Sequence, residues 1–353
     1  MKEIDALIVG QGLAGTWLSW WLEQGGLSYR ILDDADPLSA SRHAAGLINP
    51  VTGRRLVKTW MIDELMPFAW KCYSEMGSFL KTDLISETTV VDFFPTVQML
   101  QAFQKRCAEE ESYLQTGEPD VRFDSWFRYD LGWGAIRPCF LVQTPRVLTA
   151  WRNHLEEKGY LEEGLFDWDK LMPGGPSVEY AGMHYRYIVF CDGKQAARNR
   201  LFEKLPFALN KGEGLLVEID EIPRQTVFKK GMSLVPWENN IYWVGSSYEW
   251  EFADERPTEI FRSATESWLR NFLRVPFKVV GHFAALRPAT LERRPFAGFH
   301  PGYPRIGILN GLGTKGCSLA PYFAAQLAGK MISGRDIDPL ADIKRFERIL
   351  MKA

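Results

Sequence analysis

The sequence predicts an α/β protein with a discontinuous Rossmann-type nucleotide-binding domain and a second, α+β domain that holds an antiparallel sheet. Three features of the 353 residues predict this arrangement. A glycine-rich turn follows an apolar segment within residues 6–15, and a second one follows an apolar segment within residues 305–316. Between them, residues 214–245 carry a run of short apolar segments, which is typical of antiparallel strands. We therefore expect the two ends of the chain to form one domain.

The first glycine-rich turn has the context that a dinucleotide-binding motif requires. Residues 6–9 indicate a buried strand, and three glycines then follow with the spacing G-x-G-x-x-G. A helix-compatible segment, 16–24, and a second apolar segment, 29–32, come next. The alternative is a chance glycine-rich turn, which would not need these flanking elements. We expect the cofactor to contact Gly10, Gly12, Leu13, Ala14 and Gly15.

The second apolar segment ends in two acidic residues, Asp33 and Asp34. A carboxylate about 20 positions after the glycines is where the ribose of a dinucleotide is bound. Asp33 is the better candidate because it directly follows the strand, whereas Asp34 is more typical of a loop or cap residue. The loop that follows, 37–50, is rich in small residues, so a planar ligand could lie against it. Within it Arg42 can pair with a phosphate, with an ordinary surface loop as the alternative.

The second glycine-rich turn also joins a strand to a helix. It offers backbone N–H groups and a helix N-terminus to another electron-rich group. The candidate contacts are Gly311, Gly313, Thr314, Lys315 and Gly316.

The rest of the chain is assigned by periodicity and by turn residues. Helices are expected over 60–80, 96–114, 145–158 and 257–273, and a further helix follows the second glycine-rich turn and ends at about 331. Residues 164–176 form a turn-rich region. Strands are expected over 89–94, 122–128, 133–136, 185–190, 214–219, 226–228, 233–235, 241–245 and 305–310. This predicts a nucleotide domain of residues 1–80, 140–205 and 282–353, and a second domain of residues 81–139 and 206–281.

Composition excludes several classes of protein. The formal net charge of −2 gives no overall attraction to nucleic acid. The five cysteines are scattered without C-x-x-C spacing, so we expect neither a disulfide framework nor a metal site. No apolar run approaches the roughly 18 residues of a membrane helix. The first residues make a poor signal peptide, so we expect a cytoplasmic protein without membrane contact. The oligomeric state is left open.

Over nearly its whole length the sequence resembles the D-amino-acid oxidase and glycine oxidase family of FAD-dependent oxidoreductases. The first turn and Asp33 contribute to this resemblance but are shared with many flavin and NAD proteins. The more specific stretches are Ala44–Leu47, Val244–Ser247, Leu286–Thr290, Gly311–Gly316 and Leu319–Pro321.

The resemblance implies how a flavin dinucleotide would lie. The adenosine end of FAD would contact the first turn, and the second turn would face the pyrimidine edge of the isoalloxazine. Ala44, Ala45, Gly46 and Leu47 would lie beside the ring. Lys315 would neutralise the reduced flavin, unless it is an ordinary loop lysine facing solvent. The members that bind flavin covalently have a cysteine near the position of Arg287, and none stands there, which implies non-covalent FAD. Cys191-Asp192-Gly193 departs from the small residues usual in the family.

The resemblance also implies a substrate site. Arg287 matches the family arginine that holds a substrate carboxylate, with a structural ion pair to a residue such as Glu292 as the alternative. Tyr242 and Tyr248 could hydrogen-bond a substrate or wall its pocket, with core packing as the alternative. The implied reaction is oxidation of a C–N bond in a small amino-acid-like amine, such as glycine or an N-substituted glycine. Hydride passes to flavin N5, and oxygen is the acceptor.

A closer likeness joins some stretches to the oxidase domains of the bifunctional enzymes that make 5-methylaminomethyl-2-thiouridine in tRNA. These stretches are Gly245–Tyr248, Gly316–Ser318 and residues 50–73. A methyltransferase domain precedes the oxidase in those enzymes, and we expect none within these 353 residues, so the likeness leaves the substrate open. A tRNA wobble uridine with a carboxymethylaminomethyl group is therefore a second candidate substrate. The sequence also leaves open an NAD(P)-dependent dehydrogenase and a non-catalytic flavin-binding module.

Overall fold

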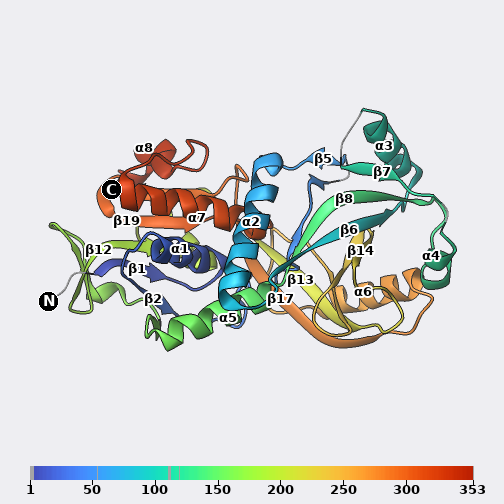
Figure 1. Ribbon diagram of the computed structural model, residues 1–353, viewed down its shortest axis with the longest axis horizontal. Coiled ribbons are helices and arrows are strands. Elements are labelled where there is room, and N and C mark those ends of the chain that lie inside the picture. The colour runs from blue at the N-terminus through green and yellow to red at the C-terminus, as the bar shows by residue number, and fades with distance from the viewer. Residues whose placement is uncertain (1–3, 54, 110–112, 119, 353) are drawn as a thin grey trace. The chain divides into compact units, whose positions relative to one another are not determined.

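The computed structural model describes residues 4–53, 55–109, 113–118 and 120–352, which fall into two compact units (Figure 1). The first unit comprises residues 1–44, 144–210 and 286–353, and the second comprises residues 45–143 and 211–285. Each unit is built around its own sheet.

The sheet of the first unit has a parallel centre. Its strands β9, β2, β1, β12 and β19 lie in that order, and each pairs in parallel with the next. The parallel strands are Leu161–Glu163, Tyr29–Asp33, Ile4–Val9, Met183–Phe190 and Tyr303–Asn310. Antiparallel strands extend it, namely β10 Leu171–Met172, β11 Val178–Tyr180 and β18 Phe296–His300. Because β2 and β12 flank β1 on opposite sides, the carboxyl end of β1 lies at a topological switch point, where open α/β sheets bind ligands.

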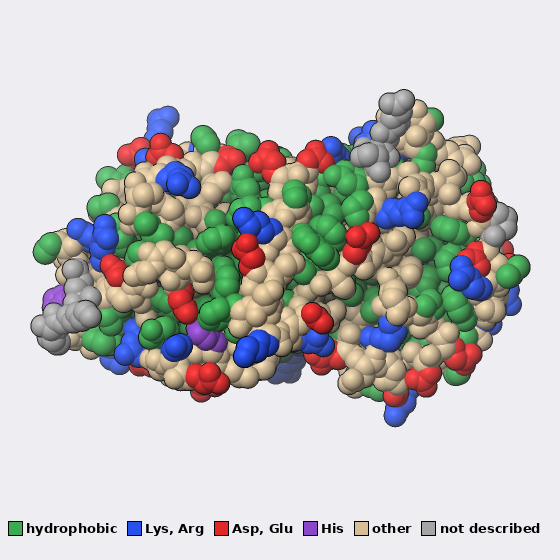
Figure 2. Space-filling view, in the orientation of Figure 1, with side chains coloured by type: hydrophobic (Ala, Val, Ile, Leu, Met, Phe, Trp, Pro, Cys, Tyr) green, Lys and Arg blue, Asp and Glu red, His purple; other side chains and the backbone are tan. Residues whose placement is uncertain are grey.

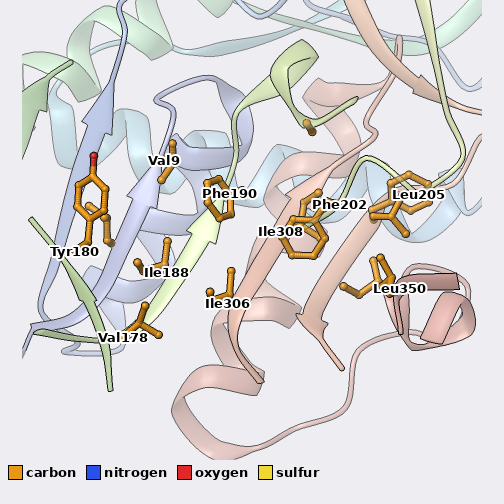
Figure 3. Packing of buried hydrophobic residues seen from close by; sticks show 14 of the residues in the cluster. Val9, Val178, Tyr180, Ile188, Phe190, Phe202, Leu205, Ile306, Ile308 and Leu350 are labelled. Carbon is orange, nitrogen blue, oxygen red and sulfur yellow. The ribbon is translucent and has the colours of Figure 1, made fainter. Parts of the chain in front are cut away.

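Helices and an aromatic-rich core cover this sheet. The helices are α1 Leu13–Gln24, α5 Thr144–Glu157, α7 Gly316–Ser333 and α8 Glu347–Leu350. Short 3-10 helices cover Trp168–Lys170, Gly193–Arg198 and Ile343–Phe346. Side chains from β1, β12 and β19 pack on one face of the sheet, among them Val9, Ile188, Phe190, Ile306 and Ile308 (Figure 3). Helices α1 and α7 are tied together where Trp21 Nε1 donates to the carbonyl of Pro321 at 2.9 Å.

The sheet of the second unit is mainly antiparallel. Its strand order is β17-β13-β16-β15-β14-β6-β8-β3, with β7 beside β8 and one parallel pair, β14 with β6. The strands are Lys278–Thr290, Phe207–Glu218, Ile241–Gly245, Met232–Pro236, Thr226–Lys230, Ile85–Phe93, Trp133–Val142, Leu47–Ile48 and Leu114–Thr116. Four helices accompany it, α2 Ile62–Leu80, α3 Val97–Ala108, α4 Val121–Trp126 and α6 Glu259–Phe272. A small two-stranded sheet joins β4 Val51–Thr52 to β5 Val57–Lys58. The chain crosses between the units within β13 and β17.

The structure corrects three predictions made from sequence. Residues 45–80 belong to the second unit, not to the nucleotide domain, because β3 pairs with β8 through Leu47 and Leu141. Residues 122–128 do not form a strand, because Phe123, Trp126 and Phe127 follow helical spacing and place two rings in a core. The helix expected over 96–114 ends at Ala108, and residues 110–112 lie outside the described part of the chain.

Within the described residues, no helix is both long enough and apolar enough to cross a membrane.

Candidate cofactor and substrate site

The first glycine turn is too tightly packed for side chains at two of its glycines. Gly10 has φ of +98°, and a Cβ there would lie 2.6 Å from the carbonyl oxygen of Cys191. A Cβ on Gly15 would lie 1.9 Å from the carbonyl oxygen of Gly10. The glycines therefore allow α1 to start directly at the carboxyl end of β1, as close approach of a helix and a turn requires.

The N-terminus of α1 is arranged to receive negative charge. Gly12, its N-cap, supplies no capping side chain, and the first turn, which includes Leu13 and Ala14, holds no acidic residue. The helix dipole therefore keeps its partial positive charge there. The hydroxyl oxygen of Ser41 accepts a hydrogen bond from the N–H of Leu13 at 3.1 Å. Sequence reasoning missed Ser41, because a serine in a loop rich in small residues carries no spacing signal of its own.

Asp33 lies at the end of β2, as predicted for a ribose-binding carboxylate. Its Oδ1 accepts from the N–H of Gln11 at 2.7 Å, so the Asp33 side chain is hydrogen-bonded to the first turn. Its Oδ2 accepts from the N–H of Ala35 at 3.2 Å and from Nη1 of Arg152 at 2.9 Å. Asp34 instead caps its own loop, since its Oδ1 accepts from the N–H of Asp36 at 3.2 Å. The loop interpretation therefore describes Asp34 better.

Arg42 lies in the loop between Asp33 and Ala44. Its backbone N–H donates to the carbonyl of Ser39 at 3.0 Å, which makes a turn, and its side chain is half-buried. The first unit thus contains Arg42, and its contact with a phosphate stays a prediction.

The second glycine turn lies next to the first. Helix α7 begins at Gly316, and a Cβ on that glycine would lie 3.3 Å from Cδ1 of Leu13, the first residue of α1. Gly311 and Gly313 have positive φ, and the N–H of Gly313 donates to the carbonyl of Pro288 at 3.0 Å. The two turns, from opposite ends of the sequence, are therefore brought together in one unit, as predicted.

The start of α7 also favours negative charge. Its first turn holds no acidic residue, and its N-cap is Lys315, preceded by Thr314. Burial and the neighbouring charges of Arg293 and Arg294 lower the pKa of Lys315. A lysine in such surroundings is destabilised as a cation until an anion approaches, so the half-buried Lys315 is not an ordinary solvent-facing lysine.

Asp192 joins the strand ends between the two turns. Its Oδ2 accepts from Nδ2 of Asn199 and its Oδ1 from Nδ2 of Asn310, each at 3.1 Å. Burial raises the pKa of Asp192 to about 6, against these two amide hydrogen bonds, which lower it. Asp192, which stands where the family usually has a small residue, therefore links the end of β12 to the end of β19.

The stretch Ala44–Leu47 spans the boundary between the units. The carbonyl of Ala44 accepts from Oγ1 of Thr144 at 2.8 Å in the first unit. Ala45, Gly46 and Leu47 belong to the second unit. A Cβ on Gly46 would lie 1.9 Å from the carbonyl oxygen of Val142, so this position requires glycine for strand pairing. Their contact with a flavin ring stays a prediction.

Arg287 is held by a neutral partner. Its Nη1 donates to Oδ1 of Asn210 at 2.7 Å, and Asn210 is buried. The acidic partner suggested by the sequence, Glu292, is paired with Nε of Arg345 at 3.2 Å. Arg287 directly precedes Pro288, whose carbonyl holds the second turn, so this guanidinium belongs to the same unit as both turns.

The two candidate tyrosines differ sharply. Tyr242 has no exposed surface, belongs to a hydrophobic core, and donates from its hydroxyl to the carbonyls of Ile222 and Pro223 at 2.9 and 3.1 Å. Burial raises its pKa to about 12. The prediction that Tyr242 meets substrate is therefore corrected to core packing. Tyr248 is 60% exposed and stays a candidate.

No group of His, Cys, Asp or Glu within the described ranges is arranged to hold a metal ion.

A family model described as FAD dependent oxidoreductase matches residues 5–330. The chain belongs to this FAD-dependent oxidoreductase family. A curated relative, glycine oxidase from Pseudomonas aeruginosa, is 30% identical over 142 residues, which is 38% of each chain. The chain therefore matches well under half of the length of that relative.

Solved structures share the fold of the family over nearly the whole chain. Glycine oxidase from Geobacillus kaustophilus has a TM-score of 0.75 at 18% identity, covering 98% of both chains. Iminodiacetate oxidase from Chelativorans has a TM-score of 0.76 at 18% identity, covering 97% of this chain and 98% of that one. L-amino acid deaminase from Proteus vulgaris has a TM-score of 0.79 at 12% identity, covering 100% and 98%. At these identities the structures show the fold alone.

The residues of the first unit fit the cofactor of the family. Two helix N-termini whose first turns hold no acidic residue lie side by side, and helix N-termini of this kind bind phosphate groups. Asp33 stands where the ribose of the adenosine would be held. The first turn alone allowed an NAD(P)-dependent dehydrogenase, and family membership favours an FAD-dependent oxidoreductase instead.

Proposed function

We propose that this oxidoreductase oxidises the C–N bond of a small amino-acid-like amine, glycine or an N-substituted glycine. The observation that carries the proposal is the place of Arg287. It directly precedes Pro288, which holds the second glycine turn, so a cation and the proposed flavin site share one unit.

Arg287 has the chemistry to bind the carboxylate of such a substrate. A guanidinium pairs with a carboxylate in a bidentate, charge-assisted fork, which also fixes the direction of the α-carbon. Asn210 holds Nη1 at 2.7 Å without adding a negative charge of its own. A carboxylate in place of that amide would compete with the carboxylate of the substrate, so this contact is compatible with a binding role.

The second turn contributes electrostatics. FAD, when bound, supplies the acceptor for the hydride that leaves the carbon next to nitrogen. The N-terminus of α7 supplies positive potential where charge would grow on the reduced ring, and the half-buried Lys315 at its N-cap can pair with that charge. We take dioxygen as the final electron acceptor and hydrogen peroxide as its product, while water hydrolyses the imine.

The relatives support this substrate class without defining it. One is named a glycine oxidase and another an iminodiacetate oxidase, and both glycine and iminodiacetate carry a carboxylate one carbon from nitrogen. On the face in Figure 2, acidic and basic side chains are interspersed, without an extended basic stretch of the kind a tRNA backbone attracts. The formal net charge of −2 and the names of these relatives favour a small molecule over a tRNA.

The test is a peroxide-release screen on the purified yellow protein. The screen covers amino acids, N-methyl amino acids, matched amines without a carboxylate, and tRNA bearing carboxymethylaminomethyl uridine. Arg287→Ala should raise KM for carboxylated amines at least tenfold, as expected for loss of a charge-assisted fork, and should leave turnover of the matched amines unchanged. Equal KM values in the variant and the parent would show that Arg287 does not bind the substrate carboxylate. Peroxide from the tRNA alone would favour the wobble-uridine substrate, and a flavin-loaded protein inactive toward the whole panel would favour a non-catalytic module.

A further inference from the structure

Three carboxylates converge on one arginine at the ribose end of the first turn. Nη1 of Arg152, on α5, lies 2.9 Å from Oδ2 of Asp33, and Nε lies 3.1 Å from Oε1 of Glu156. Nη2 is paired with Glu163 on β9. All three nitrogens of the guanidinium therefore face carboxylates, and the side chain of Arg152 is only 13% exposed.

The three contacts are not equivalent. The side chains of Glu156 and Glu163 are 52% and 68% exposed, and ion pairs in that environment contribute little. The side chain of Asp33 is 9% exposed, so its contact with Arg152 is far less screened by solvent. The pair that matters is Arg152 with Asp33.

Arg152 also reaches the glycine turn itself. Its Nη1 lies 3.4 Å from Oε1 of Gln11, whose backbone N–H donates to Oδ1 of Asp33. Gln11 is further held by its Nε2, which donates to Oγ1 of Thr16 at 3.0 Å and to the carbonyl of Leu148 at 3.2 Å. One side chain thus connects α5, the end of β2 and the turn after β1.

The hydrogen bonds of Asp33 show what this connection does. Among the described residues, Oδ2 accepts two hydrogen bonds, from Ala35 and Arg152, whereas Oδ1 accepts one, from Gln11. A carboxylate oxygen can accept two, so Oδ1 keeps an acceptor position. Holding Oδ2 fixes the rotation of the carboxylate and therefore the direction in which Oδ1 accepts.

We propose that Arg152 is a positioning residue for the adenosine end of FAD, acting through Asp33. It holds the carboxylate so that Oδ1 receives a ribose hydroxyl. Without Arg152, Asp33 would keep its backbone donors but would lie near two further carboxylates with no cation between them. Because its nitrogens are already paired, Arg152 does not offer itself to a ribose phosphate, so the site takes an unphosphorylated ribose. This inference depends on FAD binding by the family and not on the proposed substrate.

The test measures FAD and ADP affinity of the full chain after removal of bound flavin. ADP is the second probe because it carries the adenosine ribose and pyrophosphate without the isoalloxazine. Arg152→Met should weaken both by about tenfold, and by the same factor, because the lost contact lies at the shared end. Arg152→Lys should recover part of the loss, since it restores a cation. Glu156→Gln is the matched control and should bind both as the parent does.

A coupled variant separates positioning from general destabilisation. If Arg152 acts through Asp33, then Asp33→Asn combined with Arg152→Met should bind FAD no more weakly than Asp33→Asn alone. Additive losses, or an Arg152→Met protein with the FAD and ADP affinities of the parent, would overturn the proposal. If Arg152→Met does not fold, FAD and ADP affinities are measured on Arg152→Lys. Lysine reaches Asp33 only as a point charge, so it should hold the carboxylate less well than the guanidinium does. Affinities equal to those of the parent would then contradict the proposal.

Discussion

Two buried carboxylates, Asp33 in the first unit and Glu213 in the second, differ in how their oxygens are hydrogen-bonded. The side chain of Glu213 in the second unit is fully buried, and protein groups hold both of its carboxylate oxygens. Its Oε2 accepts from the N–H of Thr258 at 2.6 Å and from Nε2 of His282 at 2.9 Å. Its Oε1 accepts from Oγ1 of Thr258 at 2.8 Å and lies 3.5 Å from Nζ of Lys211.

Asp33 in the first unit keeps one acceptor position, at the edge of the sheet where parallel strands end. Glu213 therefore joins β13 to β17 and to the start of α6, whereas Asp33 is fixed by protein groups but still able to accept from a ligand. This contrast indicates that burial and charge alone do not identify a binding residue. What distinguishes the two carboxylates is the acceptor position that Oδ1 of Asp33 retains.

The largest effect should come from breaking the closed cluster. Glu213→Ala leaves Lys211, 2% exposed, without its carboxylate, and removal of one partner from a buried pair costs about 3–5 kcal/mol. We expect that loss in the free energy of unfolding, measured with urea on the FAD-loaded chain. Glu251→Gln, on the exposed loop nearby, is the control and should lie within about 0.5 kcal/mol of the parent. A loss below about 1 kcal/mol would mean that Glu213 is not the centre of this cluster.

The next effect should separate ligand binding from stability in the first unit. Gly15→Ala places a methyl group 1.9 Å from the carbonyl oxygen of Gly10, so the first turn must move, at a cost of about 1–3 kcal/mol. We expect purified Gly15→Ala to lose most of its flavin, judged by its visible absorption. Gly26→Ala is the control, because that glycine also lies by a helix end but has open space around it and only the strain of its positive φ. Full flavin content in Gly15→Ala would show that the turn does not approach the cofactor.

The smallest effect should distinguish the two tyrosines. Tyr242→Phe removes a buried hydroxyl that donates to the carbonyl of Ile222, which should cost about 1 kcal/mol of stability without changing KM. Tyr248→Phe, at an exposed position, should leave stability unchanged and alter KM if it meets substrate. Urea unfolding and peroxide-release kinetics on both variants make the comparison. A changed KM for Tyr242→Phe with unchanged stability would reverse the assignment.

Much of the first unit could be predicted from sequence because its site is made of backbone. Glycine spacing after an apolar segment specifies a turn, and Asp33 follows its strand directly, so both could be placed without coordinates. The same reasoning placed the second turn, although it comes from the opposite end of the chain.

The side-chain network could not be predicted in this way. Arg152 is 119 residues from Asp33 in the chain, and only the parallel order of β1, β2 and β9 brings α5 beside them. Asn210 carries no motif that points to Arg287. The sequence could not place Tyr242 in the core, because a strand position alone does not say which face is buried. Residues 45–80 were assigned to the wrong unit for the same reason, because β3 pairs with β8, a strand far away in the sequence.

The most direct test of this cofactor-binding mode is a crystal structure of the FAD-loaded protein. We expect the adenosine ribose within hydrogen-bond distance of Oδ1 of Asp33, the pyrophosphate at the N-terminus of α1, and the pyrimidine edge of the flavin at Gly313–Gly316. A flavin that occupies only one of the two turns, or lies away from both, would contradict it.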